Sequence, residues 1–106
     1  MEGPTDSNIR IAGGKTALML AAANGNVESV RALINKGAEV NAREYTHGWT
    51  ALVYSIWNQD IHIVEELLNS GADTKSRDKE NRTPLEHARI SGDADVIRLL
   101  ERLKAR

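Results

Sequence analysis

The sequence has no cysteine and no phenylalanine, and it has only two tryptophans and two tyrosines. Without cysteine the chain can form no disulfide, no thiolate nucleophile and no zinc site with sulfur ligands. Because 41% of the residues are nevertheless hydrophobic, the core must consist mainly of aliphatic side chains and alanine. Such a core favours thin, closely packed helices over a β-sandwich, which uses more aromatic and β-branched residues.

The chain also lacks a long apolar run and an excess of charge of one sign. No stretch approaches the roughly 20 apolar residues of a membrane-spanning helix, and the polar start resembles neither a signal peptide nor a transit peptide. Fourteen basic and fifteen acidic residues give a net charge of −1, so no overall attraction to nucleic acid or anionic membranes is expected. At 106 residues the sequence predicts one domain, cytoplasmic or, in a eukaryote, nuclear.

A short motif recurs along the chain as Thr16–Leu18, Thr50–Leu52 and Thr83–Leu85, at intervals of 34 and 33 residues. Each threonine suits the N-cap of a short helix with an apolar face. A tight turn and a second helix follow, and in the first two copies this helix ends before Gly37 and Gly71. Helices this short are marginal in water, so stacking of neighbouring repeats must stabilise them. The pattern predicts stacked helix–turn–helix units.

These copies resemble the ankyrin repeat, whose pattern runs G-x-T-P-L-H-x-A-A, then a second helix, then G-A-D-V-N-A. The matching segments are Gly14–Leu18 with Ala21 and Ala22, Gly37–Ala42, Gly48–Leu52, Gly71–Asp73 and Asp78–Leu85. The resemblance implies an all-α ankyrin-repeat solenoid of three stacked helix–turn–helix units with projecting hairpin loops. The single domain would span residues 14–106, with repeats at 14–43, 44–77 and 78–106.

Residues 1–13 precede this domain as a polar leader. Three interpretations of the leader stay open: it covers the first repeat, it derives from a tag, or it marks the truncation of a longer array. Chain termini that are not tied to the core are often poorly ordered, so the leader is also a candidate for disorder.

The chain departs from the ankyrin pattern at two turns and at one core position. Asn81 and Gln59 stand where the family has glycine. Asparagine tolerates the left-handed conformation, whereas glutamine should strain its turn by about 1 kcal/mol or bend it differently. His87 replaces a core leucine, and we expect its ring to form a hydrogen bond. The family's histidine after T-P-L, and with it the Thr–His bond, is missing in all three copies, where the residues are Met19, Val53 and Glu86.

No motif predicts a cofactor or a metal site. Gly13–Thr16 is similar to the end of a phosphate-binding loop, but that loop needs a glycine where the chain has Ile9. The turn and the N-cap of the first repeat explain the same residues. Two histidines at i and i+4 on a helix would suit a metal, and no such pair exists among His47, His62 and His87.

Acidic pairs and basic clusters likewise favour solvated faces over catalysis or nucleic-acid binding. Glu65 and Glu66 are adjacent on a helix, so their side chains point about 100° apart and do not converge on a substrate. Residues 1–74 hold five bases and nine acids, net −4, and residues 75–106 hold nine bases and six acids, net +3. The basic part has no aromatic residue on which a base could stack, so nucleic acid is not expected as a partner.

In the ankyrin family the hairpin tips and the first helices form the concave surface that binds partners. The resemblance therefore implies partner contact at Tyr45, His47, Trp49, Trp57, Asn58, Lys79, Glu80, Arg82 and Ile90. Tryptophan and tyrosine dominate binding hot spots because one side chain buries a large area at little entropic cost. Structural roles stay open for both tryptophans: Trp49 would brace its hairpin, and Trp57 would fold over Ile56 and Ile90.

The resemblance implies a non-catalytic module that binds another protein, as an adaptor, scaffold or inhibitor, through its concave face and hairpin tips. No cofactor and no membrane are expected as partners, and the chain alone is expected to be monomeric. One alternative is a fragment of a larger multi-repeat protein whose activity lies elsewhere. An enzyme or a nucleic-acid binder is the remote alternative, because a single-layer stack offers a shallow groove and not a water-excluding pocket.

Overall fold

The computed structural model describes residues 8–104, so residues 1–7 of the leader and residues 105–106 lie outside it. Within that part of the chain the fold is all-α, as predicted. Its elements are a short 3₁₀ turn, η2 (Ala12–Gly14), and six helices: α1 (Ala17–Ala23), α2 (Val27–Asn35), α3 (Ala51–Trp57), α4 (Ile61–Asn69), α5 (Pro84–Ser91) and α6 (Ala94–Lys104). The stack is elongated, with extents of 43 × 26 × 24 Å.

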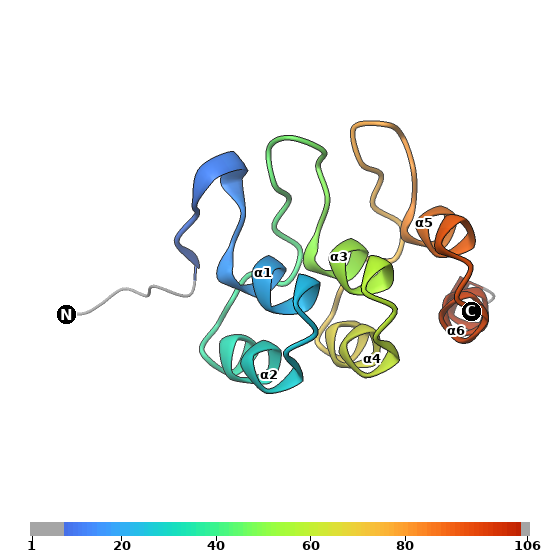
Figure 1. The fold of residues 1–106 in the computed structure, drawn as a ribbon, viewed down its shortest axis with the longest axis horizontal. Helices are drawn as coiled ribbons and strands as arrows, with labels where there is room; N and C mark the ends of the chain where they lie inside the picture. Colours follow the sequence, from blue (N-terminus) through green and yellow to red (C-terminus); the bar gives the residue numbers. More distant parts are fainter. Residues whose placement is uncertain (1–7, 105–106) are drawn as a thin grey trace.

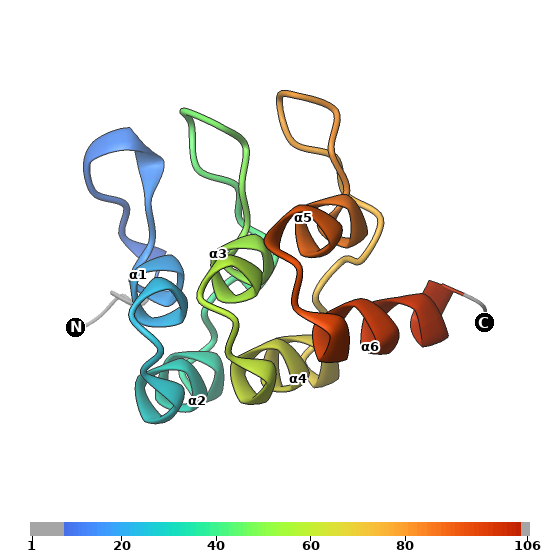
Figure 2. The same cartoon turned by 45° about the vertical axis from the view of Figure 1, so that its right-hand side comes forward.

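The helices form two rows, and hairpin loops project from one of them. α1, α3 and α5 pack side by side as the inner row, and α2, α4 and α6 form the outer row behind them. The first hairpin (residues 10–16), the second (43–50) and the third (77–83) all extend in the same direction from the inner row (Figures 1 and 2). The three helix pairs and the projecting hairpins confirm the predicted repeat architecture.

Threonine caps begin two of the three inner helices. Thr16 accepts a hydrogen bond from the Met19 N–H at 3.3 Å, and Thr83 accepts one from the Glu86 N–H at 3.2 Å. The side chains that stand in place of the family's histidine complete these caps. Met19 Sδ accepts from the Thr16 N–H at 3.4 Å. Glu86 Oε1 accepts from the Thr83 N–H at 2.8 Å, so Thr83 and Glu86 form a capping box.

The third inner helix, α3, lacks this arrangement. Thr50 occupies its N-cap, but its side chain makes no cap hydrogen bond. Its hydroxyl oxygen is buried and has no hydrogen-bond partner. The residue three positions later is Val53, which offers no polar atom to reach back. The start of α3 is therefore held by packing and backbone geometry alone.

Both residues that replace glycine adopt the left-handed conformation. Gln59 has φ 58° and Asn81 has φ 65°, and they are the non-glycine residues with positive φ in the described chain. The turn after α3 thus keeps the family's shape and accepts the strain instead of bending. Gln59 also reaches the next repeat, because its Nε2 donates to the carbonyl of Ser91 at 3.2 Å.

The core is aliphatic, as the composition indicated. Its fully or almost fully buried members include Leu18, Ala22, Val30, Leu52, Ile56, Ile63, Val64, Leu67, Ala88 and Val96. His87 is buried among them with no exposed surface. Over residues 8–104, no helix is both long and apolar enough to cross a membrane.

The chain from Asn8 onward, which the sequence analysis placed in the leader, continues the repeat pattern. The Ile11 N–H donates to the carbonyl of Lys15 at 2.8 Å and closes the first hairpin. Asn8 Oδ1 accepts from the Glu39 N–H at 2.9 Å, in the same way that Asn41 Oδ1 accepts from the Asp73 N–H at 2.8 Å. The described end of the leader is therefore an ordered hairpin packed on the first repeat.

Backbone and arginine hydrogen bonds hold neighbouring hairpins in register. The Tyr45 N–H donates to the carbonyl of Gly13 at 2.7 Å, and the Lys79 N–H donates to that of His47 at 2.9 Å. Equivalent arginines repeat this link: Arg10 donates to the carbonyl of Arg43 at 2.8 Å, and Arg43 donates to that of Arg77. The hairpins thus form one continuous surface above the inner row.

Candidate partner-binding surface

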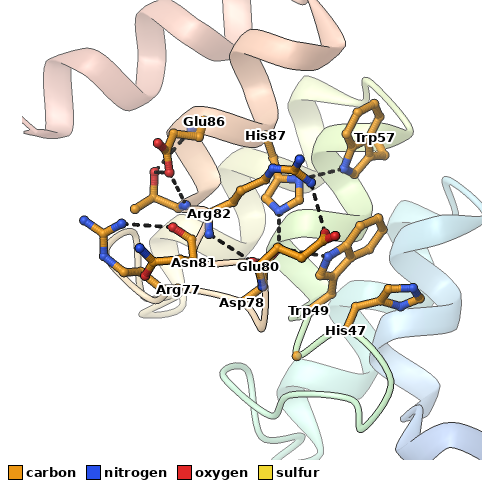
Figure 3. Close-up of polar contacts among 12 residues, drawn as sticks. His47, Trp49, Trp57, Arg77, Asp78, Glu80, Asn81, Arg82, Glu86 and His87 are labelled. Carbon is orange, nitrogen blue, oxygen red and sulfur yellow. Dashed lines mark hydrogen bonds and ion pairs between the residues drawn. The ribbon is translucent and has the colours of Figure 1, made fainter.

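Three aromatic rings from different elements meet between the hairpins and the inner row. Trp49 comes from the second hairpin, Trp57 is the last residue of α3, and His87 lies in α5. The two indoles are stacked, with ring centroids 6.3 Å apart and an interplanar angle of 11°. The His87 ring stands edge-on to both, at 5.2 Å from Trp49 and 5.9 Å from Trp57 (Figure 3). We call these three residues the aromatic cluster.

A chain of hydrogen bonds runs through the aromatic cluster and ends on Asp78. Trp57 Nε1 donates to His87 Nδ1 at 3.0 Å. Because an indole N–H can only donate, His87 Nδ1 must accept, and the ring proton lies on Nε2. His87 Nε2 therefore donates to Asp78 Oδ2 at 2.7 Å, and Trp49 Nε1 donates to the same oxygen at 3.1 Å. The imidazole is neutral in this arrangement, and the hydrogen bonding expected for it is present. It holds Trp57 directly, whereas Trp49 is held by Asp78, which His87 also bonds.

Asp78 holds its charge inside the third hairpin. Its second oxygen, Oδ1, accepts from the backbone N–H groups of Glu80 and Arg82, each at 2.9 Å. Burial by itself would raise the pKa of Asp78, but these two N–H groups and the His87 side chain together hold the pKa below its ordinary value. The carboxylate is thus an internal acceptor that shapes the hairpin.

Glu44 plays the same part in the second hairpin. Its carboxylate is buried and accepts from the His47 N–H at 2.7 Å, from His47 Nδ1 at 3.1 Å and from the Tyr54 hydroxyl at 3.2 Å. Burial alone would raise the pKa of Glu44, but these donors lower it. Burial, with the charge of Glu44 beside it, raises the pKa of Tyr54 to about 12.

Apolar side chains lie exposed on the inner row beside the aromatic cluster. Trp57 is 40% exposed, Ile90 57% and Leu20 38%. Trp57 and Ile90 occupy the same position of consecutive repeats, seven residues after the N-cap threonine. Leu20 lies on α1, one helical turn before the equivalent position, Ala23. Leu20, Trp57 and Ile90 therefore form a row across the three repeats, which we call the apolar row.

The predicted site residues differ in how exposed they are and in what they contact. Trp49 is half-buried and bonded to Asp78, so the bracing role left open for it is present. Trp57 lies against Trp49 and His87, to which its ring and its N–H are joined. The other predicted residues are exposed: Tyr45, His47, Asn58, Lys79, Glu80, Arg82 and Ile90.

Tyr45 stands apart from the two tryptophans. Its ring lies over the first hairpin, where a Cβ on Gly14 would come within 2.6 Å of it, so glycine is needed at that point. The Arg10 guanidinium is 5.3 Å from the ring centroid, in a cation–π contact. No ring contact in residues 8–104 joins Tyr45 to Trp49 or Trp57. The aromatic candidates therefore belong to two places on the surface.

Sequence reasoning missed the two buried carboxylates and one apolar residue. Asp78 and Glu44 occupy the same position of the third and second hairpins, and that alignment was the available signal. Leu20 lies one helical turn before Ala23, the residue of the first repeat that is equivalent to Trp57, so the repeat alignment could have identified it.

Charge is divided between two sides of the stack as well as along its length. In the three hairpins Glu80 is the exposed acid, whereas the bases are Arg10, Lys15, Arg43, Arg77, Lys79 and Arg82. α1 and α3 carry no charged residue. Acids outnumber bases on the outer row and its turns, where they are Glu28, Glu39, Asp60, Glu65, Glu66, Asp73, Asp93, Asp95 and Glu101. The hairpin side is therefore basic and the outer side acidic.

The comparisons with known proteins concern the whole repeat array. A family model described as ankyrin repeats, in three copies, matches residues 3–78 and 46–105. A comparison with curated proteins finds no match. Within residues 8–104, no group of three or more histidine, aspartate or glutamate side chains is placed to hold a metal ion.

Proposed function

Since the chain belongs to the ankyrin-repeat family, whose repeats are generally protein–protein interaction modules, we propose that it binds a partner protein through its concave face and hairpin tips. The concave face consists of the apolar row and the aromatic cluster beneath the three hairpins. The role would be that of an adaptor, scaffold or inhibitor without catalysis.

The observation that carries this proposal is the way Trp57 is held. Its ring is 40% exposed, yet its N–H is bonded to a fully buried histidine and its face is stacked on Trp49. A large apolar side chain that is already fixed loses little conformational entropy when a partner covers it. Such fixed aromatic side chains are typical of binding hot spots.

The neighbouring residues support binding more than catalysis. The two buried carboxylates, Glu44 and Asp78, are surrounded by donors from their own hairpins and from the inner row. A catalytic carboxylate needs to reach a substrate in a pocket that excludes water. Here the carboxylates hold the loop shape, and the surface above them is an apolar row open to a partner.

The test compares Trp57→Ala with His62→Ala, a control on the exposed face of α4. Proteins captured from cells by the wild-type chain and by the control, but not by Trp57→Ala, are candidate partners. For such a partner we expect Trp57→Ala to weaken binding by at least about 2 kcal/mol, or about 30-fold in Kd. Melting temperatures of all three proteins are measured alongside. If affinity holds while the melting temperature of Trp57→Ala falls, Trp57 is structural and the proposal is wrong.

A further inference from the structure

Two of the three acids of the second and third hairpins, Glu44 and Asp78, are buried, whereas Glu80 is exposed. Glu44 is 2% exposed and Asp78 is 8% exposed, and each accepts hydrogen bonds from backbone N–H groups of its own hairpin. A carboxylate that is buried and bonded in this way offers little to a partner. The charges that a partner meets on the hairpins are therefore mostly the basic ones.

Two of those basic residues share the hairpin position of Trp49. Lys15, Trp49 and Arg82 each come directly before the N-cap threonine of their repeat. Figure 3 shows the Arg82 side chain pointing toward the side of the third hairpin where Trp49 lies, whereas Arg77 points the opposite way. Lys15 occupies the corresponding position of the first hairpin, so we place it on the same side by the repeat alignment. The aromatic cluster is thus flanked by one cation on each neighbouring repeat.

The inner row below these cations is largely apolar, and its two charged residues, Glu86 and Arg89, both lie on α5. α1 and α3 contain no charged residue, and the exposed side chains of the apolar row are Leu20, Trp57 and Ile90. The only polar atom of the Trp57 side chain already donates to His87. What remains of Trp57 for a partner is apolar surface, so an apolar side chain of the partner fits it best.

We infer, on the basis of the proposed function, that the partner contributes an acidic segment in which an apolar side chain is flanked by aspartate or glutamate. The apolar side chain packs on Trp57 and Ile90, and the carboxylates face Lys15 and Arg82. Charge complementarity supplies the reason. The hairpins are mostly basic, the opposite charges of Glu86 and Arg89 on the inner row balance, and most exposed acids lie on the outer side. Opposite charges of this kind speed association and exclude partners of the wrong sign.

Glu80 marks the place where a partner carboxylate would sit. Its Oε1 lies 3.0 Å from Arg82 Nη1, in an exposed ion pair on the third hairpin. A carboxylate arriving from a partner competes with Glu80 for the same guanidinium and is repelled by it. Removing that charge with Glu80→Gln should therefore strengthen binding of an acidic segment about threefold, since exposed charge pairs contribute modestly.

The experiment selects ligands from a random-sequence peptide library displayed on phage, using the full chain as bait. Enriched peptides are then synthesised and titrated against the chain by fluorescence anisotropy. We expect enriched sequences with an apolar residue between acidic ones. Their affinity should fall about tenfold between about 50 mM and about 500 mM NaCl, because exposed charges are screened.

Matched charge reversals locate the effect. Lys15→Glu with Arg82→Glu should weaken binding about tenfold or more. The control is Arg98→Glu with Arg102→Glu on α6, which should change affinity by less than about twofold. The pairs are comparable because one arginine in each is in an exposed ion pair, Arg82 with Glu80 and Arg98 with Asp95. Circular dichroism checks that both variants keep their helices.

The outcomes separate this inference from the proposed function. If the enriched peptides are neutral or basic but bind Trp57→Ala more weakly than the wild type, the inference of an acidic partner is wrong. The proposed interaction surface is then still supported. Peptides that bind Trp57→Ala as well as the wild type overturn both, as does a selection that enriches nothing. A third outcome is that the chain binds single-stranded RNA more tightly than any acidic peptide, and that Lys15→Glu with Arg82→Glu weakens the RNA binding. The hairpin cations would then form a nucleic-acid surface, and the inference would be overturned.

Discussion

Trp57 donates its indole N–H to Nδ1 of His87 across 3.0 Å, so a side chain that is 40% exposed is bonded to one that is fully buried. Thirty residues of sequence separate the two. The bond joins the end of α3 to the middle of α5, and His87 passes the connection on to Asp78 in the third hairpin. The position of the exposed Trp57 ring and the shape of the third hairpin therefore depend on the same imidazole.

Replacing that imidazole should affect both stability and binding. His87→Leu removes the acceptor of Trp57 and one donor of the buried Asp78 carboxylate, and we expect unfolding free energy to fall by about 2 kcal/mol. Tryptophan fluorescence should also change, because Trp57 loses the bond that orients it. Urea unfolding measures the first effect. The control His62→Leu, exposed on α4, should stay within about 0.5 kcal/mol of wild type, and equal losses for the two variants would contradict the role given to His87.

Two of the three N-cap threonines, Thr50 and Thr83, should respond differently to loss of their hydroxyl. Thr83→Val removes a cap that accepts from the Glu86 N–H, so a loss of about 1 kcal/mol is expected. Thr50→Val should leave stability unchanged or raise it, because its buried oxygen has no hydrogen-bond partner. Thermal unfolding of the two variants side by side gives the comparison. A larger loss for Thr50→Val than for Thr83→Val would show that the oxygen is satisfied after all.

Tyr54 makes the fold sensitive to alkali. Burial and the neighbouring Glu44 charge raise its pKa to about 12, above the ordinary value of about 10 for tyrosine. Since the folded state holds the proton more tightly than the unfolded state, Tyr54 contributes stability that is full below about pH 10 and is lost as pH rises toward about 12. Phenolate absorbance should show one tyrosine titrating near pH 12, and Tyr54→Phe should remove that step. If the step persists in Tyr54→Phe, the assignment is wrong.

Glycine at position 59 should relieve the strain at the end of α3. Gln59 has a left-handed backbone, with φ 58°, in which its Cβ is strained. Because Gln59→Gly removes this Cβ, we expect the free energy of unfolding to rise by about 1 kcal/mol. Loss of the exposed bond from Gln59 to the Ser91 carbonyl offsets part of it. Asn58→Gly is the matched control, since its φ of −77° needs no glycine and it should lose about 0.5 kcal/mol. Chemical denaturation of both variants measures the difference, and a loss for Gln59→Gly would argue against strain.

The helices and caps could be predicted because their causes lie within a few residues. Thr83 and Glu86 close a capping box three residues apart, and the glycines and Asn81 end their turns locally. The aliphatic content likewise indicated a thin helical core. The local pattern could not predict where the first hairpin begins. The hydrogen bonds that order this segment, between Asn8 and Glu39 and between Arg10 and Arg43, join residues that are distant in sequence.

The candidate site was predictable in its positions but not in its contacts. Trp49 and Trp57 were placed on the concave side by alignment of the repeats alone. Their stacking, and their shared dependence on Asp78 and His87, arise where α3, α5 and two hairpins meet. Only packing selects the rotamers that bring these side chains together.

Sequence alone determined the repeat and the helical class, because the period of 33 or 34 residues and the short-range caps can be read directly along the chain. It also indicated the residues that are proposed for partner contact. Tertiary structure decided the electrostatic character of the surface. In chain order the charges divide into an acidic first part and a basic second part, whereas stacking sorts them by their position within each repeat. It also buries Glu44 and Asp78, because each hairpin turns its own N–H groups toward a carboxylate. The basic face exists only once the repeats are stacked.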